Sequence, residues 1–275
     1  MNPSRIGCST ITYRKLTLEQ ALEQIASHGF QRVDLGMIDK FCPHINPLEV
    51  DEAGLSQIAE KLKQLNLQVS SCNTWSLAHL NDPNGLQVEF PYLLASFKVA
   101  QQLGTKVVTV QPGRKVEASQ WQLQAQQVVS LLEQLGQVAD SMGLRLAIEA
   151  PHKGTLAEEF ENAARLVRML NSDLVGVVID SSHIQSAGVH VQEVLSAYGD
   201  RVHHVHLRDY GSHGFATPGD GDFEFAALFN GLDALGYNGD FNLELEFPEP
   251  TLEEINREVG RALAFLHKEA SWPIK

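Results

Sequence analysis

Short runs of apolar and β-branched residues alternate along the chain with longer segments whose apolar residues recur every three or four positions. The short runs are typical of buried strands, and the longer segments are typical of helices with one buried face. Strands are predicted over residues 5–8, 32–36, 67–72, 106–111, 145–149, 175–180, 202–207 and 241–247. Each is followed by a predicted helix, over residues 16–28, 50–65, 92–103, 117–142, 156–170, 191–198, 223–235 and 251–267. The chain is therefore a series of eight strand–helix units.

This alternation predicts parallel pairing of the strands, because a parallel connection needs a crossover of the kind that a helix provides. Eight such units close most simply into a barrel, and 275 residues are close to the roughly 250 of a (β/α)₈ barrel. An open doubly wound sheet is the alternative, but it usually carries a glycine-rich phosphate-binding turn after its first strand. Here Cys8-Ser9-Thr10 ends the first strand without such a turn. We therefore predict an α/β protein with a single (β/α)₈ (TIM) barrel, one domain over residues 1–275, since no Pro/Ser-rich linker divides the chain.

The composition says little more about the fold, but it excludes several classes of partner and site. The formal net charge of −13 disfavours binding to nucleic acid and to anionic membranes, because both are themselves negative. No stretch approaches the roughly 18 apolar residues of a membrane span, and the first residues carry no signal peptide pattern, so we expect a cytoplasmic protein. The three cysteines, Cys8, Cys42 and Cys72, form no CxxC pair. They predict small buried residues rather than a disulfide framework or a thiolate zinc site.

Candidate chemistry lies where the predicted strands end, because TIM barrels build their active sites at the C-terminal face. Four neighbouring strand ends carry residues that could bind a metal at one height of the barrel: Glu149, Asp180, His206 and Glu244. Carboxylates and imidazole suit Mn²⁺, Zn²⁺, Co²⁺ or Mg²⁺. The set therefore predicts one divalent metal ion, with Mn²⁺ or Zn²⁺ favoured. Any one acidic residue could instead start a loop or cap a helix, and Glu246, on the same inward face, is the rival of Glu244.

Several segments around these strand ends form recognisable motifs. They are I-E at 148–149, D-S-S-H at 180–183, H-V-H-L-R-D at 204–209, and G-Y-N-G at 236–239 leading to L-E at 243–244. With them the chain resembles the xylose isomerase-like TIM barrel superfamily, which contains sugar isomerases and epimerases, inosose-processing enzymes and apurinic-site endonucleases. The resemblance is close over the C-terminal half, and the strand rhythm extends it over the whole chain. It implies the four metal ligands above, with Glu149 and Glu244 also serving as the catalytic acid and base.

Six further residues are candidate substrate contacts: His183, Arg208, His152, Gln111, Trp75 and Glu246. The resemblance implies a substrate contact for His183, in a predicted loop; in the endonucleases the matching histidine helps to bind an additional metal. Arg208 follows His206 by two residues and so shares its inward face. It would bind a hydroxyl, carboxylate or phosphate, or else pair with Asp209 or lie solvated at the rim.

Four other positions each have a structural interpretation or a less specific role in binding. Trp75 would form an apolar wall for a sugar or pack within its loop. Asp34, at the end of the second predicted strand, would make structural hydrogen bonds or contact the substrate. His204 lies one pleat below His206, and we predict a core histidine bonded to a neighbour. His152 takes a polar role near the place where the ketose epimerases carry a further glutamate.

Departures from the endonucleases sharpen the functional prediction. Gln111 stands where those enzymes have a metal-binding histidine, the third strand runs into Ser71-Cys72-Asn73, and their D-x-H element after the seventh strand is missing. Together with the acidic charge, these departures favour one metal and a small polar substrate.

We therefore predict a metal-dependent isomerase or epimerase of a monosaccharide, sugar phosphate or related keto-polyol, working by proton transfer through an enediolate. A dehydratase of the inosose dehydratase kind is the alternative, because it begins with the same proton abstraction. A metal-dependent phosphodiesterase or endonuclease and a non-catalytic sugar binder are less favoured. The sequence leaves open whether the chain forms a homo-oligomer.

Overall fold

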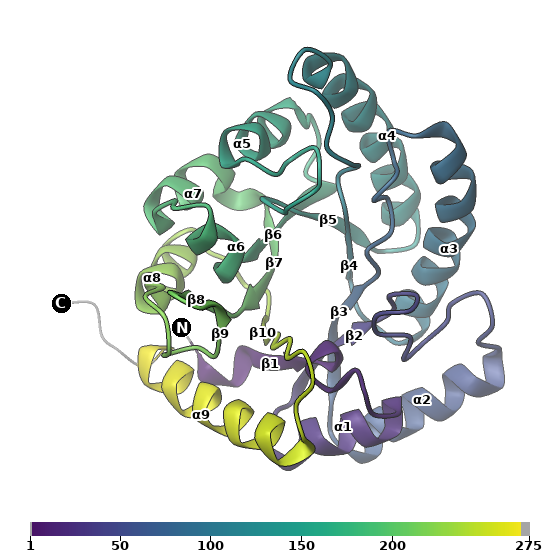
Figure 1. Ribbon diagram of the computed structural model, residues 1–275. Helices are drawn as coiled ribbons and strands as arrows, with labels where there is room; N and C mark the ends of the chain where they lie inside the picture. The colour runs from purple at the N-terminus through teal and green to yellow at the C-terminus, as the bar shows by residue number, and fades with distance from the viewer. Residues whose placement is uncertain (1, 271–275) are drawn as a thin grey trace.

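The computed structural model, which describes residues 2–270, closes eight parallel strands into the barrel predicted from the sequence (Figure 1). The barrel strands are β1 (Ile6–Ser9), β2 (Arg32–Gly36), β3 (Gln68–Asn73), β4 (Val107–Val110), β5 (Arg145–Glu149), β6 (Val175–Asp180), β7 (Val202–Leu207) and β10 (Phe241–Leu243). Strands that follow one another in sequence lie side by side, and β1 pairs with β10 to close the ring. The predicted fold class is confirmed.

Helices form an outer ring around the strands (Figure 1). They are α1 (Leu18–Ser27), α2 (Glu52–Gln64), α3 (Pro83–Gln102), α4 (Trp121–Ser141), α5 (Phe160–Met169), α7 (Val191–Tyr198), α8 (Phe225–Ala234) and α9 (Leu252–Ala270). Short 3₁₀ helices lie at Pro3–Arg5, Thr10–Tyr13 and Gly199–Arg201. Apolar side chains between strands and helices make one extended core. Within residues 2–270, no helix is both long and apolar enough to cross a membrane.

The strand β6 shows why the barrel gives a continuous apolar pattern. All six of its residues are buried, since one face of the strand meets the helices and the other fills the barrel. The sequence Val-Gly-Val-Val-Ile is therefore apolar on both faces, and the only charged residue is Asp180 at its end. The three cysteines are buried and unpaired, as predicted.

Two elements after barrel strands were not predicted. Asp180 caps a short helix, α6 (Ser181–Ser186), so His183 lies on a helix and not in a loop. After β7, the strands β8 (Asp209–Gly211) and β9 (Gly214–Ala216) pair as a small antiparallel hairpin. Both elements stand at the C-terminal mouth of the barrel, where they add residues around the strand ends.

Several predicted boundaries were wrong, among them the starts of α4 and α5, each four residues later in the structure, and most of all the start of α3. The helix α3 begins at Pro83 rather than at residue 92, because the side chain of Asp82 caps it by accepting a hydrogen bond from the backbone of Asn84. The sequence prediction had taken Asp82, Pro83 and Gly85 as part of a long loop; in the structure Asp82 is the cap, Pro83 is the first helical residue, and the helix runs on through Pro91. The strand β10 ends at Leu243 instead of at residue 247.

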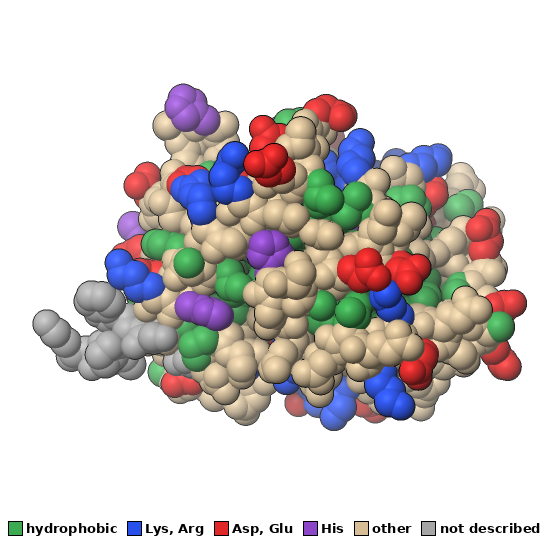
Figure 2. Space-filling model, turned by 90° about the horizontal axis from the view of Figure 1, so that it is seen from below, with side chains coloured by type: hydrophobic (Ala, Val, Ile, Leu, Met, Phe, Trp, Pro, Cys, Tyr) green, Lys and Arg blue, Asp and Glu red, His purple; other side chains and the backbone are tan. Residues whose placement is uncertain are grey.

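The outer side of the helix ring carries mixed charge. Figure 2 views the molecule from below Figure 1, where α9, α1 and α2 form the outer layer, and acidic and basic side chains are interspersed over this face. On these helices, Lys61 of α2 forms ion pairs with Glu19 and Glu23 of α1. The face in view therefore presents no concentrated field of one sign.

Candidate metal centre

The four predicted ligands meet at the C-terminal mouth of the barrel. One potential ligand atom from each of Glu149, Asp180, His206 and Glu244 lies within 4.8 Å of the others, and all four residues are buried. Glu149 and Asp180 are the last residues of β5 and β6, and His206 is in β7. Glu244 directly follows β10, and its backbone N–H donates to the carbonyl of Leu207 over 3.1 Å. The barrel thus brings the predicted set to one place.

The sequence had suggested that the four residues lie at one height of the barrel. In the structure they do not all lie at the same level of strand pairing. Asp180 is paired with His206, but Glu149 is paired with Val178, two residues before Asp180. Glu244 is likewise one step past the pair Leu243–Leu207. Because strands of such barrels tilt by about 36° to the axis, side chains offset along neighbouring strands still converge.

Asp180 divides its two carboxylate oxygens between a structural task and the cluster. Its Oδ1 accepts hydrogen bonds from the backbone N–H groups of Ser182 and His183, over 2.8 and 3.2 Å, and from the Ser182 hydroxyl over 2.6 Å. This arrangement is a helix N-cap, which satisfies the free N–H groups of α6. The other oxygen, Oδ2, is left facing the barrel mouth, 3.4 Å from a guanidinium nitrogen of Arg208.

The two glutamates are divided in the same way by amide side chains. Gln111 donates from Nε2 to Oε2 of Glu149 over 2.8 Å, and Asn73 donates from Nδ2 to Oε1 of Glu244 over 3.3 Å. The remaining oxygens face His206: Oε2 of Glu244 lies 3.2 Å and Oε1 of Glu149 lies 3.8 Å from its Nδ1. Each carboxylate therefore presents one oxygen to a common point beside this ring nitrogen.

His206 itself is the unsatisfied member of the cluster. Its ring is buried, and neither Nδ1 nor Nε2 has a hydrogen-bond partner of good geometry among residues 2–270. A buried polar atom without a partner costs free energy, and such atoms are rare in native structures. Three carboxylate oxygens and an imidazole nitrogen are the donor types that Zn²⁺ and Mn²⁺ accept. The residues present therefore fit a divalent cation on this observation of the structure.

The pKa values within the cluster show how strongly its charges interact. Burial raises the pKa of Glu244 to about 8, and the neighbouring charges of Glu149 and Glu246 add to the rise. Burial alone would lower the pKa of His206, but the carboxylates of Glu244, Glu149 and Asp34 outweigh it and raise that pKa to about 10. In the absence of a cation, both groups hold a proton at neutral pH. A divalent cation would replace these protons as the balancing positive charge.

Ring side chains form a continuous wall beside the cluster, which we call the aromatic rim: Phe41, Trp75, His152, His183 and Phe215. Trp75 stacks on Phe41 with ring centroids 5.1 Å apart, and its edge approaches His152 at 6.3 Å. The ring of His152 meets that of His183 at 4.7 Å, and His183 meets Phe215 at 5.7 Å. Three of the six candidate substrate contacts thus lie on one wall, with Trp75 37% exposed and Phe215 53% exposed.

The two candidate histidines on this wall also reach toward the ligands. Nε2 of His152 lies 3.8 Å from Oε2 of Glu149, and Nε2 of His183 lies 3.9 Å from Oδ2 of Asp180. The Nδ1 of His152 is 3.0 Å from the carbonyl oxygen of Lys153. These imidazoles therefore stand between the aromatic rim and the buried carboxylates.

Arg208 is buried rather than solvated, and it does not pair with Asp209, so both of those alternatives were wrong. Its guanidinium donates to Oε1 of Glu246 over 2.8 Å and to the Ser182 hydroxyl over 2.9 Å, and approaches Asp180. The ring of Phe215 stacks against it at 4.1 Å. Glu246 is thus bound by Arg208. The glutamate that joins the four-residue cluster is its rival, Glu244. Asp209 instead accepts backbone N–H groups of the loop between β9 and α8.

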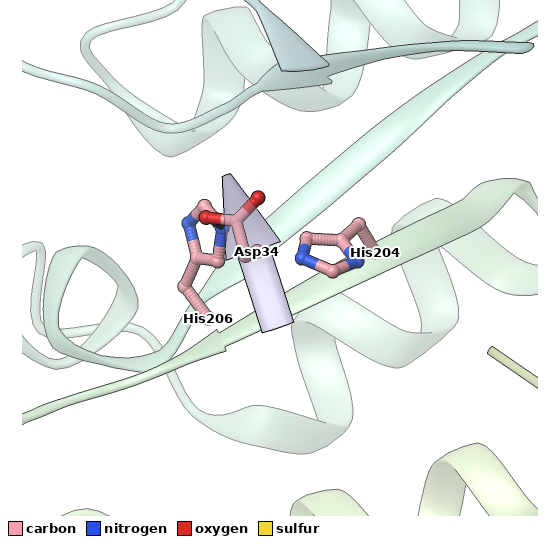
Figure 3. A group of neighbouring side chains, drawn as sticks. All are labelled: Asp34, His204 and His206. Atoms are coloured by element: carbon pink, nitrogen blue, oxygen red, sulfur yellow. Dashed lines mark ion pairs between the residues drawn. The ribbon is translucent and has the colours of Figure 1, made fainter. Parts of the chain in front are cut away.

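A second group of buried polar side chains lies in the barrel beside His206 and includes Asp34 and His204, which Figure 3 shows with His206. Asp34, on β2, accepts hydrogen bonds from the hydroxyls of Ser9 and Ser71 over 2.8 and 2.5 Å. His204 is bonded through Nε2 to the Ser71 hydroxyl at 2.9 Å, so the prediction of a core histidine bonded to a neighbour is confirmed. For Asp34, the structure shows the structural hydrogen bonds that were one of its two interpretations.

Asn73 is the residue that the sequence analysis missed as part of the site. It entered only as a departure from the endonucleases, although it is the last residue of β3 and donates to Glu244. Its position at a strand end was the available signal. An amide there was easy to pass over, because it offers neither charge nor a strong metal-binding atom.

Known proteins share the sequence pattern of this chain over most of its length. The model of the family described as xylose isomerase-like TIM barrel matches residues 22–268. Among curated proteins, the inosose isomerase of Bacillus subtilis is 24% identical over 249 residues, which cover 86% of this chain and 87% of that protein. The inosose dehydratase of Clostridium beijerinckii is 24% identical over 265 residues, which cover 84% of this chain and 82% of that protein.

Solved structures share the architecture. A crystal structure of the IOLI protein with a bound zinc atom superposes with a TM-score of 0.81 at 21% identity, covering 97% of this chain and 99% of that one. A D-psicose 3-epimerase with D-tagatose from Clostridium cellulolyticum superposes with a TM-score of 0.79 at 14% identity, again covering 97% and 99% of the two chains. At these identities the likeness to solved structures shows the fold alone.

Proposed function

Because the chain belongs to the xylose isomerase-like TIM barrel family, we propose that it is a divalent-metal-dependent isomerase or epimerase of a monosaccharide, sugar phosphate or related keto-polyol. The observation that carries the proposal is the convergence of one potential ligand atom from each of Glu149, Asp180, His206 and Glu244, together with the ring nitrogens of His206, which have no hydrogen-bond partner in the described part of the chain. The match to a curated inosose isomerase over most of both chains supports this class of reaction. The proposed ligands are Glu149, Asp180, His206 and Glu244.

In such a reaction a proton is removed from the carbon beside a carbonyl. It is then returned to the other face of that carbon or to a neighbouring atom. When bound, the cation supplies Lewis-acid polarisation of a substrate oxygen, which makes the adjacent C–H group more acidic. The two glutamates then act as the acid and the base. They come from β5 and β10, which flank β6 and β7 in the barrel, so their carboxylates approach the cluster from different sides.

The chain holds these two glutamates in fixed and different environments. Gln111 fixes Glu149 and Asn73 fixes Glu244, in each case through one oxygen. Burial opposes ionisation of Glu149, but the neighbouring His152, His206 and His183 outweigh it and lower its pKa, whereas burial raises the pKa of Glu244 to about 8. These pKa values belong to the chain without a cation; what carries over to the metal-loaded chain is that the two carboxyl groups are held in different environments, which suits the separate roles of base and acid.

The proposed substrate contacts surround this pair. Trp75 offers an apolar face to the C–H groups of a sugar ring, and His152 and His183 offer ring N–H groups to its hydroxyls. Gln111 binds Glu149 and can bind the substrate through Oε1, which is buried without a partner in the described part of the chain. Arg208 and Glu246 bind each other, so we propose that they meet the substrate as a pair.

A dehydratase is the second candidate, and the match to inosose dehydratases over 84% of the chain is the observation that favours it. It begins with the same proton abstraction and differs in the next step, when a hydroxyl leaves instead of a proton returning. The ligand set and the two glutamates serve both reactions.

Product analysis separates the two. The purified chain, loaded with Mn²⁺ or Zn²⁺, is incubated with a panel of ketoses and inososes in D₂O and followed by NMR and mass spectrometry. An isomer or epimer with deuterium at the exchanged carbon supports the proposal, and a product that has lost water supports the dehydratase. If the metal-loaded chain transforms no member of the panel and exchanges no C–H proton, the proposal fails for these substrates.

A further inference from the structure

The two ring nitrogens of His206 face different surroundings. Nδ1 is the atom beside Glu244 and Glu149, at 3.2 and 3.8 Å, and is therefore the nitrogen that can bind a cation held by those carboxylates. Nε2 points to the opposite edge of the ring, away from them. Among the residues that the structure describes, the carboxylate oxygen within 4 Å of Nε2 is Oδ2 of Asp34, at 3.7 Å.

Asp34 is fixed in this position from two sides. The Ser9 hydroxyl donates to its Oδ2 over 2.8 Å, and the Ser71 hydroxyl donates to its Oδ1 over 2.5 Å. The side chain is fully buried, and it reaches from β2 to the ring of His206 on β7 (Figure 3). Because both serines are donors to Asp34, the carboxylate retains a lone pair on Oδ2 for a further donor.

A histidine that binds a metal through one nitrogen must carry its proton on the other. Such histidines almost always donate that N–H to a carboxylate, carbonyl or water, which fixes the tautomer and the ring orientation. For His206 the cation would take Nδ1, so the proton must lie on Nε2. Asp34 is the carboxylate placed to receive it.

We infer that Asp34 is a positioning residue for the metal centre: its Oδ2, 3.7 Å from Nε2 of His206, closes to accept the Nε2–H when a cation takes Nδ1, and so keeps Nδ1 free for the cation. This inference rests on the metal site of the proposed function. Asp34 does not enter the proposed ligand set and acts through His206. Ser9 and Ser71 extend the arrangement by orienting Asp34 itself.

The geometry argues against a purely structural carboxylate. Two serine hydroxyls are satisfied as well by a neutral acceptor, whereas a buried carboxylate with a pKa raised by desolvation destabilises the fold unless something compensates its charge. The ring of His206 is the nearest cationic partner, since its approach opposes the rise in the pKa of Asp34. The carboxylate therefore makes sense as part of the metal centre.

The variant Asp34→Asn tests the inference, because it keeps the shape and removes the charge. Zn²⁺ affinity is measured by competition with a chromophoric chelator on the full chain, beside thermal unfolding of the same protein stripped of metal. We expect the affinity to fall by about 10- to 100-fold, the usual effect of losing such a partner, while the stripped protein keeps or gains thermal stability. The matched control is Asn242→Ser, which removes the amide near His204 in the same polar layer; it should leave the affinity within about threefold of wild type.

Equal Zn²⁺ affinity in Asp34→Asn and wild type would overturn the inference. So would parallel losses in affinity and in stability of the stripped protein, since that pattern is the mark of a general structural role. A wild-type chain that binds no Zn²⁺ would instead contradict the metal site of the proposed function.

A measurement on the unaltered chain does not depend on how the variant folds. In the Zn²⁺-loaded protein, ¹⁵N NMR of the imidazoles should show His206 with a proton on Nε2 and the metal on Nδ1. The reverse assignment, with the proton on Nδ1, would exclude Asp34 as its acceptor and overturn the inference.

Discussion

His204 and His206 lie on the same strand, point the same way into the barrel and are both buried, yet their neighbours differ in kind (Figure 3). His204 is bonded to a serine hydroxyl and lies near an asparagine amide. Burial, with the adjacent His206, holds the pKa of His204 well below its usual value. The carboxylates of Glu244, Glu149 and Asp34 raise the pKa of His206 to about 10.

The difference teaches that position within the barrel does not make a ligand; the charge of the neighbours does. In the lower layer, two neutral side chains, Ser71 and Asn242, lie against the ring of His204 and its pKa stays low, although the carboxylate of Asp34 also lies within 4.8 Å of it. In the upper layer, carboxylates surround a ring whose nitrogens lack a hydrogen-bond partner in the described chain. That imbalance is the physical mark of a cation site.

The largest expected contrast comes from changing each histidine to asparagine. His206→Asn removes Nδ1 from the ligand set and should weaken Zn²⁺ binding by more than about 100-fold. His204→Asn should keep Zn²⁺ affinity within about threefold and lose about 1–3 kcal/mol of folding free energy through its broken hydrogen bond. Chelator competition and urea unfolding measure the two quantities. Equal losses of affinity in both variants would remove the distinction between the layers.

The next contrast is between the two inward glutamates after β10. Glu244→Gln removes the proposed acid, and kcat should fall by about 10²- to 10⁴-fold on whichever substrate the panel identifies. Glu246→Gln disturbs the partner of Arg208 and should mainly raise KM. If kcat falls further in Glu246→Gln than in Glu244→Gln, the assignment of these two residues is reversed.

Metal affinity should depend on pH through the protons of Glu244 and His206, and not through His204. With pKa values raised to about 8 for Glu244 and about 10 for His206, both groups are protonated at pH 7 and must lose their protons to a cation. Affinity should therefore fall as the pH is lowered, by up to about 100-fold per pH unit between pH 8 and 6, where two protons are displaced. Calorimetry in buffers of different ionisation enthalpy counts these protons. His204→Asn should leave the slope unchanged, and a flat profile in the wild type would contradict the charge balance described here.

The smallest expected effect belongs to a carboxylate with ordinary partners. Glu133 on α4 accepts from the backbone N–H groups of Asn171 and Ser172 and from the Ser172 hydroxyl. Its burial acts to raise its pKa, but these donors prevail and lower it. Stability from this group is present above the unfolded pKa and is lost as the pH falls through the lower folded value.

Glu133→Gln should therefore cost no more than about 0.5 kcal/mol at pH 7, since the group is half-buried and solvent-screened, and progressively less as the pH falls through its lowered folded pKa. Metal affinity should not change. A loss of Zn²⁺ binding in this variant would show that the ligand variants report general damage rather than their own contacts.

The barrel was predictable because its evidence is local. Each strand and most helices leave a periodic pattern within their own residues, as β6 does with its unbroken apolar run. The ligands could also be predicted, since each stands at a strand end and such ends meet in a barrel. The short elements at the mouth could not, because α6 depends on the cap supplied by Asp180 and the hairpin β8–β9 on contacts at the mouth.

What supports the ligands lay beyond the sequence for a related reason. Asn73 and Glu244 are 171 residues apart, and Ser71 and His204 are 133 apart. No local pattern marks such pairs, and only the closed barrel puts them in contact. The burial of Arg208 likewise follows from Asp180, Glu246 and Phe215, which reach it from three different elements or loops.

We propose that one cation binds among the carboxylates of Glu149, Asp180 and Glu244 and the imidazole of His206. The most direct test is anomalous diffraction at the zinc absorption edge from crystals of the full chain grown with Zn²⁺. We expect a single strong peak within bonding distance of Glu149, Asp180, His206 and Glu244, with no peak beside His204. No peak at this cluster, or a peak between His204 and Asp34, would contradict it.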